Sequence, residues 1–443
     1  MKILKFGGTS VGSAERMKAV ASLIQRDEPI IVVLSAMSGT TNSLVQIAEK
    51  LFQNKKDEAK GLITALHDKY KQVVEELYTS EDKKKQASEL LQQHFEYLAA
   101  FTQDLFTVHE ERAVLAQGEL LSTALFQFFL EEHGIASVLL PALNFMKIDE
   151  NEEPDAAYIA KNLKTELEKH ADHKLFITQG YICRNAFGEI DNLKRGGSDY
   201  SASLIGAAAD ADEIQIWTDI DGMHNNDPRI VKNTYPIAEL SFDEAAELAY
   251  FGAKILHPSS VLPAKQKNIP VKLLNTMEPE ARGTTISSNS ESGKLKAVAA
   301  KDGITAIKIK SGRMLLAYGF LRSVFEVFER FKTPIDMITT SEVAVSLTID
   351  NDKFLKEIVT ELEKFGQVEV DQDQTIICVV GDFISERSGS GLAIFEALKQ
   401  IPLRMISYGG SKNNISVLIN TENKVEALTK LNDGIFDRSG ANA

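Results

Sequence analysis

The chain alternates short, almost continuous apolar runs with longer segments whose apolar residues recur every three or four positions. Strands buried on both faces of a sheet lose polar alternation, so we interpret the runs as strands of a parallel sheet. They lie at residues 1–8, 29–37, 136–142, 174–182, 213–220 and 269–275. Residues 42–133 keep the helical period, broken only by charged stretches. The pattern predicts an α/β domain with helices on both faces of its sheet.

A second region follows the Gly-, Ser- and Pro-rich stretch TMEPEARGTTISSNSESGK, and we place the boundary in it, near residue 290. The order strand, helix, strand, strand, helix, strand then occurs and restarts after roughly seventy residues, as in a repeated βαββαβ module. We predict one domain over residues 1–290 and two modules over 295–371 and 372–443. The second copy lacks its last strand, so we expect residues 295–301 to be donated to it and to interlock the modules.

Charge and composition exclude several classes of protein. The chain has 443 residues and a formal net charge of -14 without a basic stripe, so neither nucleic acid nor an anionic membrane is expected as a partner. Cys183 and Cys378 are too far apart in sequence to suggest a disulfide framework, which favours a reducing cytoplasm. We find no signal-peptide pattern and no apolar run of membrane-spanning length. We expect no metal held by protein side chains.

A glycine pair follows the first strand in KFGGTSVG, residues 5–12. Glycines at a strand end let backbone N–H groups approach phosphate oxygens, and the helix start that follows adds positive potential. Lys5 comes before the glycines and can reach over a phosphate, while Thr9 and Ser10 can donate hydrogen bonds or cap the helix. The alternative is a tight strand-to-helix turn with a surface lysine.

A second glycine pair lies in RGGSD, residues 195–199. Arg195 offers a bidentate fork for a carboxylate, and Asp199 offers an anion that can hold Lys5 or a metal-bound phosphate. Ligands of open α/β sheets bind at the carboxyl ends of strands, where both glycine pairs are expected. A turn with a capping aspartate is the alternative.

Three more charged residues are candidates for ligand binding. Glu119, in QGELLST, follows a glycine near an expected helix start, where a carboxylate favoured by the helix dipole is the alternative interpretation. Arg229, in DPR, and Lys254, in FGAKILHP, are cations that each have an ordinary structural explanation when taken alone. Only their combination with the two glycine pairs favours a site for an anionic substrate.

The motifs together resemble those of the aspartate kinases. KFGGTSVG, VVLSAMSGTTN, QGELLST, RGGSDYSA, WTDIDG…DPR and FGAKILHP occur in the order and approximate spacing of that family, and the repeated module resembles its paired ACT domains. The resemblance implies an amino-acid-kinase-type catalytic domain followed by two interlocked ACT-like regulatory domains. It also implies phosphoryl transfer from ATP, accompanied by Mg²⁺, to the β-carboxylate of L-aspartate, the first step toward lysine, threonine and methionine. We expect a monofunctional enzyme, without a fused homoserine dehydrogenase.

The resemblance also implies roles for individual residues. Lys5 is expected to contact the transferring phosphoryl group, Asp199 to orient Lys5, and Gly7 and Gly8 to donate backbone N–H groups. The residues implied for ATP are Lys5, Phe6, Gly7, Gly8, Ser10, Ser35, Thr218, Asp219, His224, Arg229, Lys254 and Ile255. Those implied for aspartate are Thr41, Glu119, Tyr181, Arg195, Ser198 and Asp199. Arg195 is expected on the α-carboxylate of aspartate and Glu119 on its α-ammonium.

A lysine-binding site is implied by MLLAYGFL and PIDMITTSE in the repeated modules. Lysine is therefore the expected feedback inhibitor, and a homodimer through the ACT-like modules is the expected assembly. The residues implied are Met314, Phe320, Leu321, Ile335, Asp336, Thr340, Ser341 and Glu342, of which Asp336 and Glu342 suit an ammonium. Ala317 and Pro334 stand where lysine-sensitive relatives often have serine, which leaves threonine open as an effector. His224 stands where many relatives have tyrosine.

Two other functions are open from the sequence. A kinase of the same fold that acts on glutamate, carbamate or a nucleoside monophosphate would not need Glu119 together with Arg195. A non-catalytic amino-acid sensor would not need Lys5 and Asp199, and both are present. Aspartate kinase activity is therefore the function that we predict.

Overall fold

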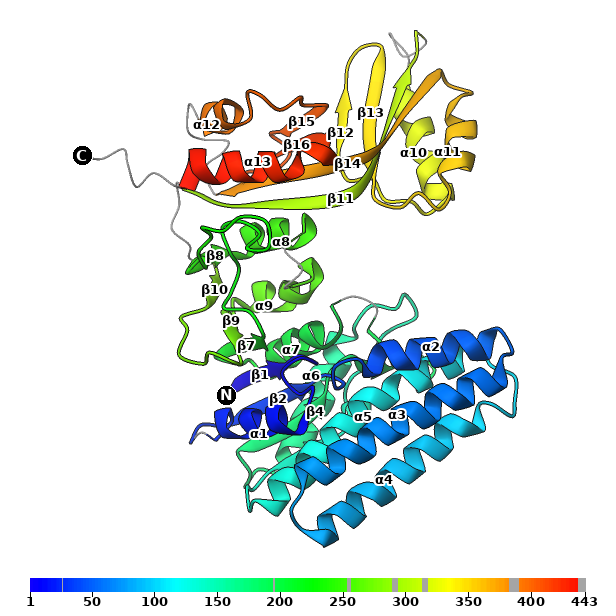
Figure 1. Cartoon of the computed structure of the whole chain (residues 1–443), viewed down its shortest axis with the longest axis vertical. Helices are drawn as coiled ribbons and strands as arrows, with labels where there is room; N and C mark the ends of the chain where they lie inside the picture. Colours follow the sequence, from blue (N-terminus) through cyan, green and yellow to red (C-terminus); the bar gives the residue numbers. More distant parts are fainter. Residues whose placement is uncertain are drawn as a thin grey trace, which may run out of the picture. The chain divides into compact units, whose positions relative to one another are not determined.

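The computed structural model describes residues 1–25, 27–193, 196–252, 256–288, 294–312, 318–381 and 390–436 (Figure 1). The chain divides into two compact units. Unit 1 comprises Met1–Met223, Ala238–Phe242 and Leu256–Asn289, and unit 2 comprises His224–Ile237, Asp243–Ile255 and Ser290–Ala443. Two segments that precede residue 290 therefore pack with the C-terminal region, and the domain boundaries expected from the sequence stay a prediction.

Unit 1 is built on a sheet that, in the described part of the chain, has eight strands in the order β3, β4, β2, β1, β7, β9, β10, β8. Neighbouring strands are parallel except β9 and β10. The strands are β1 (Lys2–Phe6), β2 (Ile30–Leu34), β3 (Val138–Leu140), β4 (Leu175–Gln179), β7 (Glu213–Thr218), β8 (Glu239–Ser241), β9 (Val271–Asn275) and β10 (Thr284–Ser287). All residues of β2 are buried, which explains its unbroken apolar sequence. The predicted parallel sheet is confirmed, and the short β8 and β10 were missed.

Helices cover both faces of this sheet, as predicted (Figure 1). Successive strand residues point to opposite faces, so Leu4 packs in the large hydrophobic core on one face while Ile3 faces Gly206 of α7 (Gly197–Ala208) on the other. The first layer contains α1 (Ala14–Leu23), α2 (Thr40–Phe52), α3 (Lys56–Leu77), α4 (Glu81–Ala100) and α5 (Val108–Glu132). The other helices of unit 1 are α6 (Ala156–Glu168), α7 (Gly197–Ala208) and α9 (Leu262–Lys267), with short 3₁₀ turns at Ala142–Asn144 and Pro258–Val261.

α5 is the central helix of its layer. It starts with a capping box, in which the Thr107 hydroxyl accepts the His109 N–H and the Glu110 carboxylate accepts the Thr107 N–H. By length and composition α5 could cross a membrane, but 72% of its most apolar window is buried inside the fold. The expectation that no apolar run reaches this length is therefore corrected. The apolar run ends at Glu119 in the sequence, but the helix continues through that residue. The burial is that of a core helix.

Unit 2 contains a second sheet, antiparallel throughout, with six strands in the described residues in the order β12, β13, β11, β14, β16, β15. The strands are β11 (Leu295–Lys310), β12 (Ile338–Thr340), β13 (Ala344–Ile349), β14 (Gln367–Gly381), β15 (Met405–Tyr408) and β16 (Asn414–Asn420). The long β11 and β14 run through both halves of the sheet (Figure 1). Residues 295–301 of β11 pair with residues 376–381 of β14, the first strand of the second copy. The two βαββαβ copies thus share strands.

Each half of this sheet has its own core and its own helices. α10 (Phe320–Arg330) and α11 (Leu355–Leu362) cover the first half, and α12 (Ser390–Ala397) and α13 (Lys424–Leu431) cover the second. A 3₁₀ turn at Thr421–Asn423 and a single π turn at Asn432–Phe436 flank α13. Most of α8 (Phe242–Tyr250) also belongs to unit 2. The predicted repeat is confirmed, whereas the fusion of neighbouring strands into two long ones was not foreseen.

Candidate active site

The turns after β1 and β2 lie against each other at the carboxyl edge of the parallel sheet. The Ser38 N–H donates to the carbonyl of Gly8 at 3.1 Å, and the Ser35 N–H donates to the carbonyl of Phe6 at 3.2 Å. A Cβ atom on Gly8 would stand 2.9 Å from the Ala36 carbonyl oxygen, so this position requires glycine for the close approach. Gly8 therefore allows the turns after β1 and β2 to pack closely against each other.

Three of the residues expected to bind ATP in the first turn have partners within the protein, and their role toward ATP stays a prediction. The Gly7 N–H donates to the Trp217 carbonyl at 3.2 Å and is not available to a phosphate in this structure. Ser10 is 1% exposed, and its hydroxyl shares a 2.7 Å hydrogen bond with Thr276. The side chain of Phe6 is buried and stacks on Trp217, with 5.7 Å between ring centroids. These residues build the turn, and Ser13, rather than Thr9 or Ser10, caps α1.

Lys5 and Asp199 form the ion pair that the sequence predicted. The distance from Nζ of Lys5 to Oδ1 of Asp199 is 2.6 Å, and the two side chains are 10% and 16% exposed. Asp199 lies in the first turn of α7, where the N-cap Gly196 (φ 71°) and the first helical residue Gly197 (φ 46°) have left-handed backbone. Residues other than glycine rarely adopt this conformation, so the second glycine pair sets the direction from which Asp199 meets Lys5.

Glu119 lies in the middle of α5 rather than near a helix start, so the first-turn interpretation is wrong. Its side chain is buried, and Oε1 accepts the N–H of Ala36 in the second glycine turn at 3.2 Å. Burial raises the pKa of the Glu119 carboxyl to about 8, although the hydrogen bond from Ala36 opposes the shift. A buried carboxyl with a raised pKa is a candidate binding group, and it can pair with a cationic group of a ligand once it has lost its proton.

Glu119 lines a cavity of about 490 Å³ between the glycine turns. Its other walls come from the first turn, the second turn, and the segments before and at the start of α7. They are Gly8, Thr9, Ser35, Ala36, Met37, Ser38, Gly39, Thr41, Asn42, Tyr181, Gly197 and Ser198. Four predicted aspartate residues, Glu119, Thr41, Tyr181 and Ser198, thus share one cavity, and Asp199 directly follows Ser198. Ala36, Met37, Ser38, Gly39 and Asn42 were missed, although all lie within the motif VVLSAMSGTTN.

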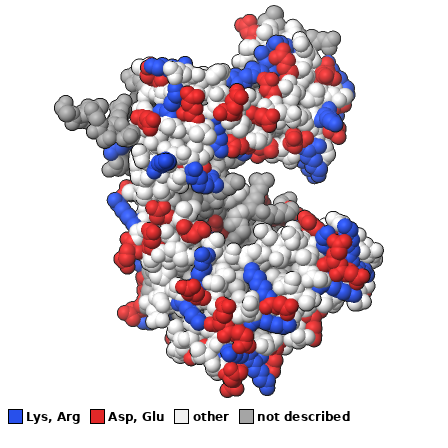
Figure 2. Space-filling model, in the orientation of Figure 1, with Lys and Arg blue, Asp and Glu red and all other residues white. Residues whose placement is uncertain are grey.

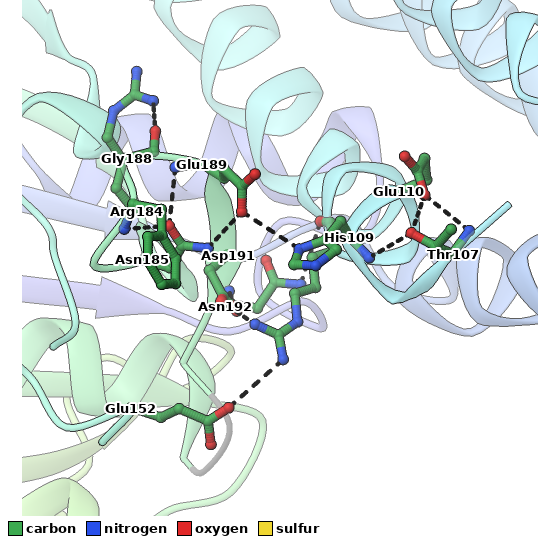
Figure 3. Close-up of polar contacts among 12 residues, drawn as sticks. Thr107, His109, Glu110, Glu152, Arg184, Asn185, Gly188, Glu189, Asp191 and Asn192 are labelled. Atoms are coloured by element: carbon green, nitrogen blue, oxygen red, sulfur yellow. Dashed lines mark hydrogen bonds and ion pairs between the residues drawn. The ribbon is translucent and has the colours of Figure 1, made fainter. Parts of the chain in front are cut away.

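A network of ion pairs and hydrogen bonds fixes α5 against the hairpin of β5 (Ile182–Arg184) and β6 (Ile190–Asn192). Arg112, two helical turns before Glu119, pairs with Asp191 of the hairpin, and His109 lies 3.4 Å from Glu189 (Figure 3). Tyr181 begins this hairpin with a left-handed backbone (φ 66°), and its N–H donates to Ser201 of α7 at 2.8 Å. The network therefore fixes the two elements that carry Glu119 and Tyr181, both of which line the cavity, to each other.

The predicted nucleotide residues do not all fall in one unit. Thr218 closes the end of β7 by accepting the Ile220 N–H at 3.0 Å, and Asp219 is exposed beside it, both in unit 1. His224 and Arg229 belong to unit 2. Arg229 forks onto Asp227 at 2.9 and 2.7 Å, so its cation is paired within its own turn. Arg195, Lys254 and Ile255 lie outside the described residues.

The predicted effector residues all belong to unit 2 but have different environments. Thr340, Ser341 and Glu342 are exposed at the end of β12, and Phe320 and Leu321 begin α10. Ile335 packs on the core of the first half. The side chain of Asp336 is 1% exposed, and Oδ1 already accepts from Nζ of Lys301 at 2.8 Å and from the hydroxyl of Tyr250 at 2.6 Å. Met314 and Ala317 lie outside the described residues.

Charge and metal ligands add two observations. Acidic and basic side chains are interspersed on the face drawn in Figure 2, without a basic stripe among the described residues there. Within the described ranges, no group of three or more His, Cys, Asp or Glu side chains is arranged to hold a metal ion.

Known proteins share both the sequence and the fold. The sequence model of the amino acid kinase family matches residues 1–275, and that of an ACT domain matches residues 377–434. Lysine-sensitive aspartokinase 3 of Escherichia coli is 34% identical, and the alignment covers 98% of this chain and 99% of that protein.

Two crystal structures of Escherichia coli aspartokinase III, each 33% identical, cover 98% of this chain. The structure with aspartate and ADP, in the R-state, covers all of that chain with a TM-score of 0.85. The structure with lysine and aspartate, in the T-state, covers 99% of that chain with a TM-score of 0.81. Likeness of this extent in sequence and fold shows that the chain belongs to the aspartokinases, within the amino acid kinase family.

Proposed function

We propose that this enzyme transfers a phosphoryl group from ATP to the β-carboxylate of L-aspartate, giving 4-phospho-L-aspartate and ADP. The observation that carries the proposal is the Lys5–Asp199 ion pair beside a cavity that Glu119 lines. The relative crystallised with aspartate and ADP supports the same pair of ligands. The fold and the site thus agree on phosphoryl transfer to a small amino acid.

The chemistry needs positive charge more than it needs a base. The attacking β-carboxylate is already ionised at neutral pH, so the difficulty is to bring it to an anionic phosphoryl group. Lys5 supplies the charge that the transferring group meets, and Asp199 holds its ammonium in place. Glu119 receives the α-ammonium of aspartate, and Arg195 its α-carboxylate. Mg²⁺ enters with ATP, held mainly by phosphate oxygens and water.

Regulation belongs to unit 2 in this proposal. Lysine inhibits the enzyme by binding in the first βαββαβ copy, near Asp336 and Glu342, and two chains associate through these copies. The lysine-bound T-state of the Escherichia coli relative supports lysine as effector. We place the enzyme in the cytoplasm, consistent with its two widely separated cysteines, which are both free and buried.

A substrate panel tests the proposed activity. We expect ADP release from ATP and Mg²⁺ to depend on L-aspartate. Carbamate and nucleoside monophosphates should give less than about a hundredth of that rate, because a site that pairs both ends of a zwitterion rejects ligands that leave a buried group unpaired. L-Glutamate keeps both ends but has one more methylene, so its rate should be lower by roughly tenfold to two-hundredfold. Higher activity with any of the other acceptors would reassign the substrate. Adding lysine, threonine or methionine in turn identifies the effector.

A further inference from the structure

The strongest unexplained cluster surrounds Asp336 in unit 2. Oδ1 of this carboxylate accepts two hydrogen bonds, from Lys301 and from Tyr250. Oδ2 is buried and has no hydrogen-bond partner among the residues that the structure describes. A carboxylate can accept about four hydrogen bonds, so Asp336 has unused capacity in a place where water does not reach it.

Lys301 is shared between two carboxylates. Its Nζ lies 2.8 Å from Asp336 and 2.8 Å from Asp350, and it stands 4.4 Å from the ring centre of Tyr250. Burial alone would lower the pKa of Lys301, but the hydrogen bonds to Asp336 and Asp350 outweigh it and raise the pKa. The ammonium therefore stays charged. Two carboxylates against one ammonium leave this cluster with an excess negative charge.

The cluster joins elements that are distant in sequence. Lys301 lies where the pairing of β11 shifts register, Asp350 follows β13, and Tyr250 is the last residue of α8. The Asp336 N–H donates to the carbonyl of Thr348 at 2.9 Å, which fixes the backbone beneath the carboxylate. The backbone of Asp336 is thus held in place, whereas its hydrogen-bond donors are the ends of two side chains, Lys301 and Tyr250, that can adopt other rotamers.

We propose that Lys301 and Tyr250 are internal competitors of the inhibitor's ammonium for Asp336. The inference rests on the feedback inhibition proposed above. The inhibitor's ammonium bonds to both carboxylate oxygens of Asp336, to Oδ2, which has no partner among the described residues, and to Oδ1, which Lys301 and Tyr250 hold, and its positive charge repels the ammonium of Lys301. Lys301 then retreats to Asp350, which already holds it, so no buried charge is left unpaired.

The exchange has a consequence for α8. While Lys301 and Tyr250 hold Asp336, the end of α8 is bound to the first βαββαβ copy through the Tyr250 hydroxyl. Displacement of these partners removes that hydrogen bond. An effector can shift an equilibrium only through different affinities for its two states, and the exchange of partners at Asp336 supplies such a difference.

Variants of the full chain give effects of opposite sign. Tyr250→Phe and Lys301→Met each remove a competitor, so we expect half-maximal inhibition at a lysine concentration at least threefold lower than in the wild type. Asp350→Asn removes the position to which Lys301 retreats, so the required concentration should rise at least threefold. Lys301→Arg keeps the charge and should stay within twofold. Tyr97→Phe, a half-exposed tyrosine of unit 1, is the matched control and should change nothing.

The outcomes separate the two proposals. If lysine inhibits the wild type but Tyr250→Phe and Lys301→Met leave the half-inhibitory concentration unchanged, the competition is overturned and feedback stands. The competition is also overturned, and feedback again stands, if Asp350→Asn shifts the half-inhibitory lysine concentration in the same direction as Lys301→Met. If lysine does not inhibit the wild type, feedback and competition fall together, while the kinase activity is judged by its own assay. Activity without lysine, measured in every variant, distinguishes a misfolded protein from a change in sensitivity.

Discussion

Two lysine–aspartate pairs, one in each unit, have similar lengths and different surroundings. Lys5 and Asp199 are 2.6 Å apart, and Lys301 and Asp336 are 2.8 Å apart. Lys5 pairs with one carboxylate at the edge of a cavity. Lys301 pairs with a second carboxylate, Asp350, and its ammonium also lies over the ring of Tyr250.

The difference teaches which ligand charge each site can accept. The pair in unit 1 is balanced, so an anion that enters the neighbouring cavity meets a lysine whose charge it can share. The cluster in unit 2 has two carboxylates and one ammonium, so a cation completes it. The number of carboxylates around the lysine, rather than the length of the ion pair, distinguishes a site for a phosphoryl group from a site for an ammonium.

The largest effect is expected from Lys5→Met, which removes the cation of the balanced pair. Loss of one group that stabilises developing charge costs about a hundredfold to a thousandfold in kcat, and the KM for ATP should change far less. Lys2→Met, on the same strand with a surface partner, should stay within about twofold because surface ion pairs contribute little. Retention of more than about a tenth of wild-type kcat by Lys5→Met would make the Lys5–Asp199 pair merely structural.

A smaller effect, on substrate binding, is expected from Glu119→Gln. The substitution removes the carboxylate that we propose to bind the α-ammonium of aspartate in unit 1. Hydrogen bonds to charged groups contribute about 1.5–3 kcal/mol, so the KM for aspartate should rise roughly tenfold to a hundredfold. The KM for ATP should stay within about twofold, as should both constants in the control Glu131→Gln at the far end of α5. Parallel increases in both constants would show damage to the fold instead.

The pKa of Glu119 predicts how aspartate binding depends on pH. In the free enzyme this carboxyl is protonated below about pH 8, and it must lose the proton to pair with an ammonium. The KM for aspartate should therefore fall as pH rises from 6 to 8 and then level off, whereas Glu119→Gln should flatten this dependence. Because the folded-state pKa is raised, the stability linked to this proton is lost as pH rises through about 8. A KM that rises with pH over this range in the wild type would contradict the assignment.

The smallest effects are expected from two glycine substitutions, measured as thermal or urea unfolding. Gly8→Ala places a Cβ 2.9 Å from a backbone oxygen and should destabilise by about 1–3 kcal/mol. Gly61→Ala, in the exposed part of α3 with nothing within 4 Å of the new Cβ, should stabilise by roughly 0.5–1 kcal/mol. Equal effects of the two would show that the turns in unit 1 do not depend on close approach.

The sequence was informative where a local backbone demand is visible in it. Gly8 and Gly196 are required by close approach and by left-handed backbone, so the glycine motifs located the cavity and the Lys5–Asp199 pair correctly. It was less informative where a partner arrives from afar. The acceptor of the Gly7 N–H and the burial of Ser10 depend on β7 and on the segment after β9.

In unit 2 the partners that come from distant parts of the chain are even harder to predict from the sequence. The periodicity of its strands predicted the repeat, but no local pattern brings Tyr250, 86 residues away, to Asp336. Lys301 is separated from Asp336 by 35 residues and lies at a register shift that only the paired strands define. The partners of a buried carboxylate are a property of the tertiary fold, and for this reason the sequence assigned Asp336 to a ligand without seeing its internal competitors.

The central claim is most directly tested by trapping the product. Acyl phosphates react with hydroxylamine to give hydroxamates, so wild-type enzyme with ATP, Mg²⁺, L-aspartate and hydroxylamine should form aspartate hydroxamate in the same amount as ADP. Lys5→Met should form almost none, and L-glutamate should not replace aspartate. Release of ADP without hydroxamate, or equal trapping by Lys5→Met, would contradict phosphoryl transfer to aspartate at the Lys5–Asp199 site.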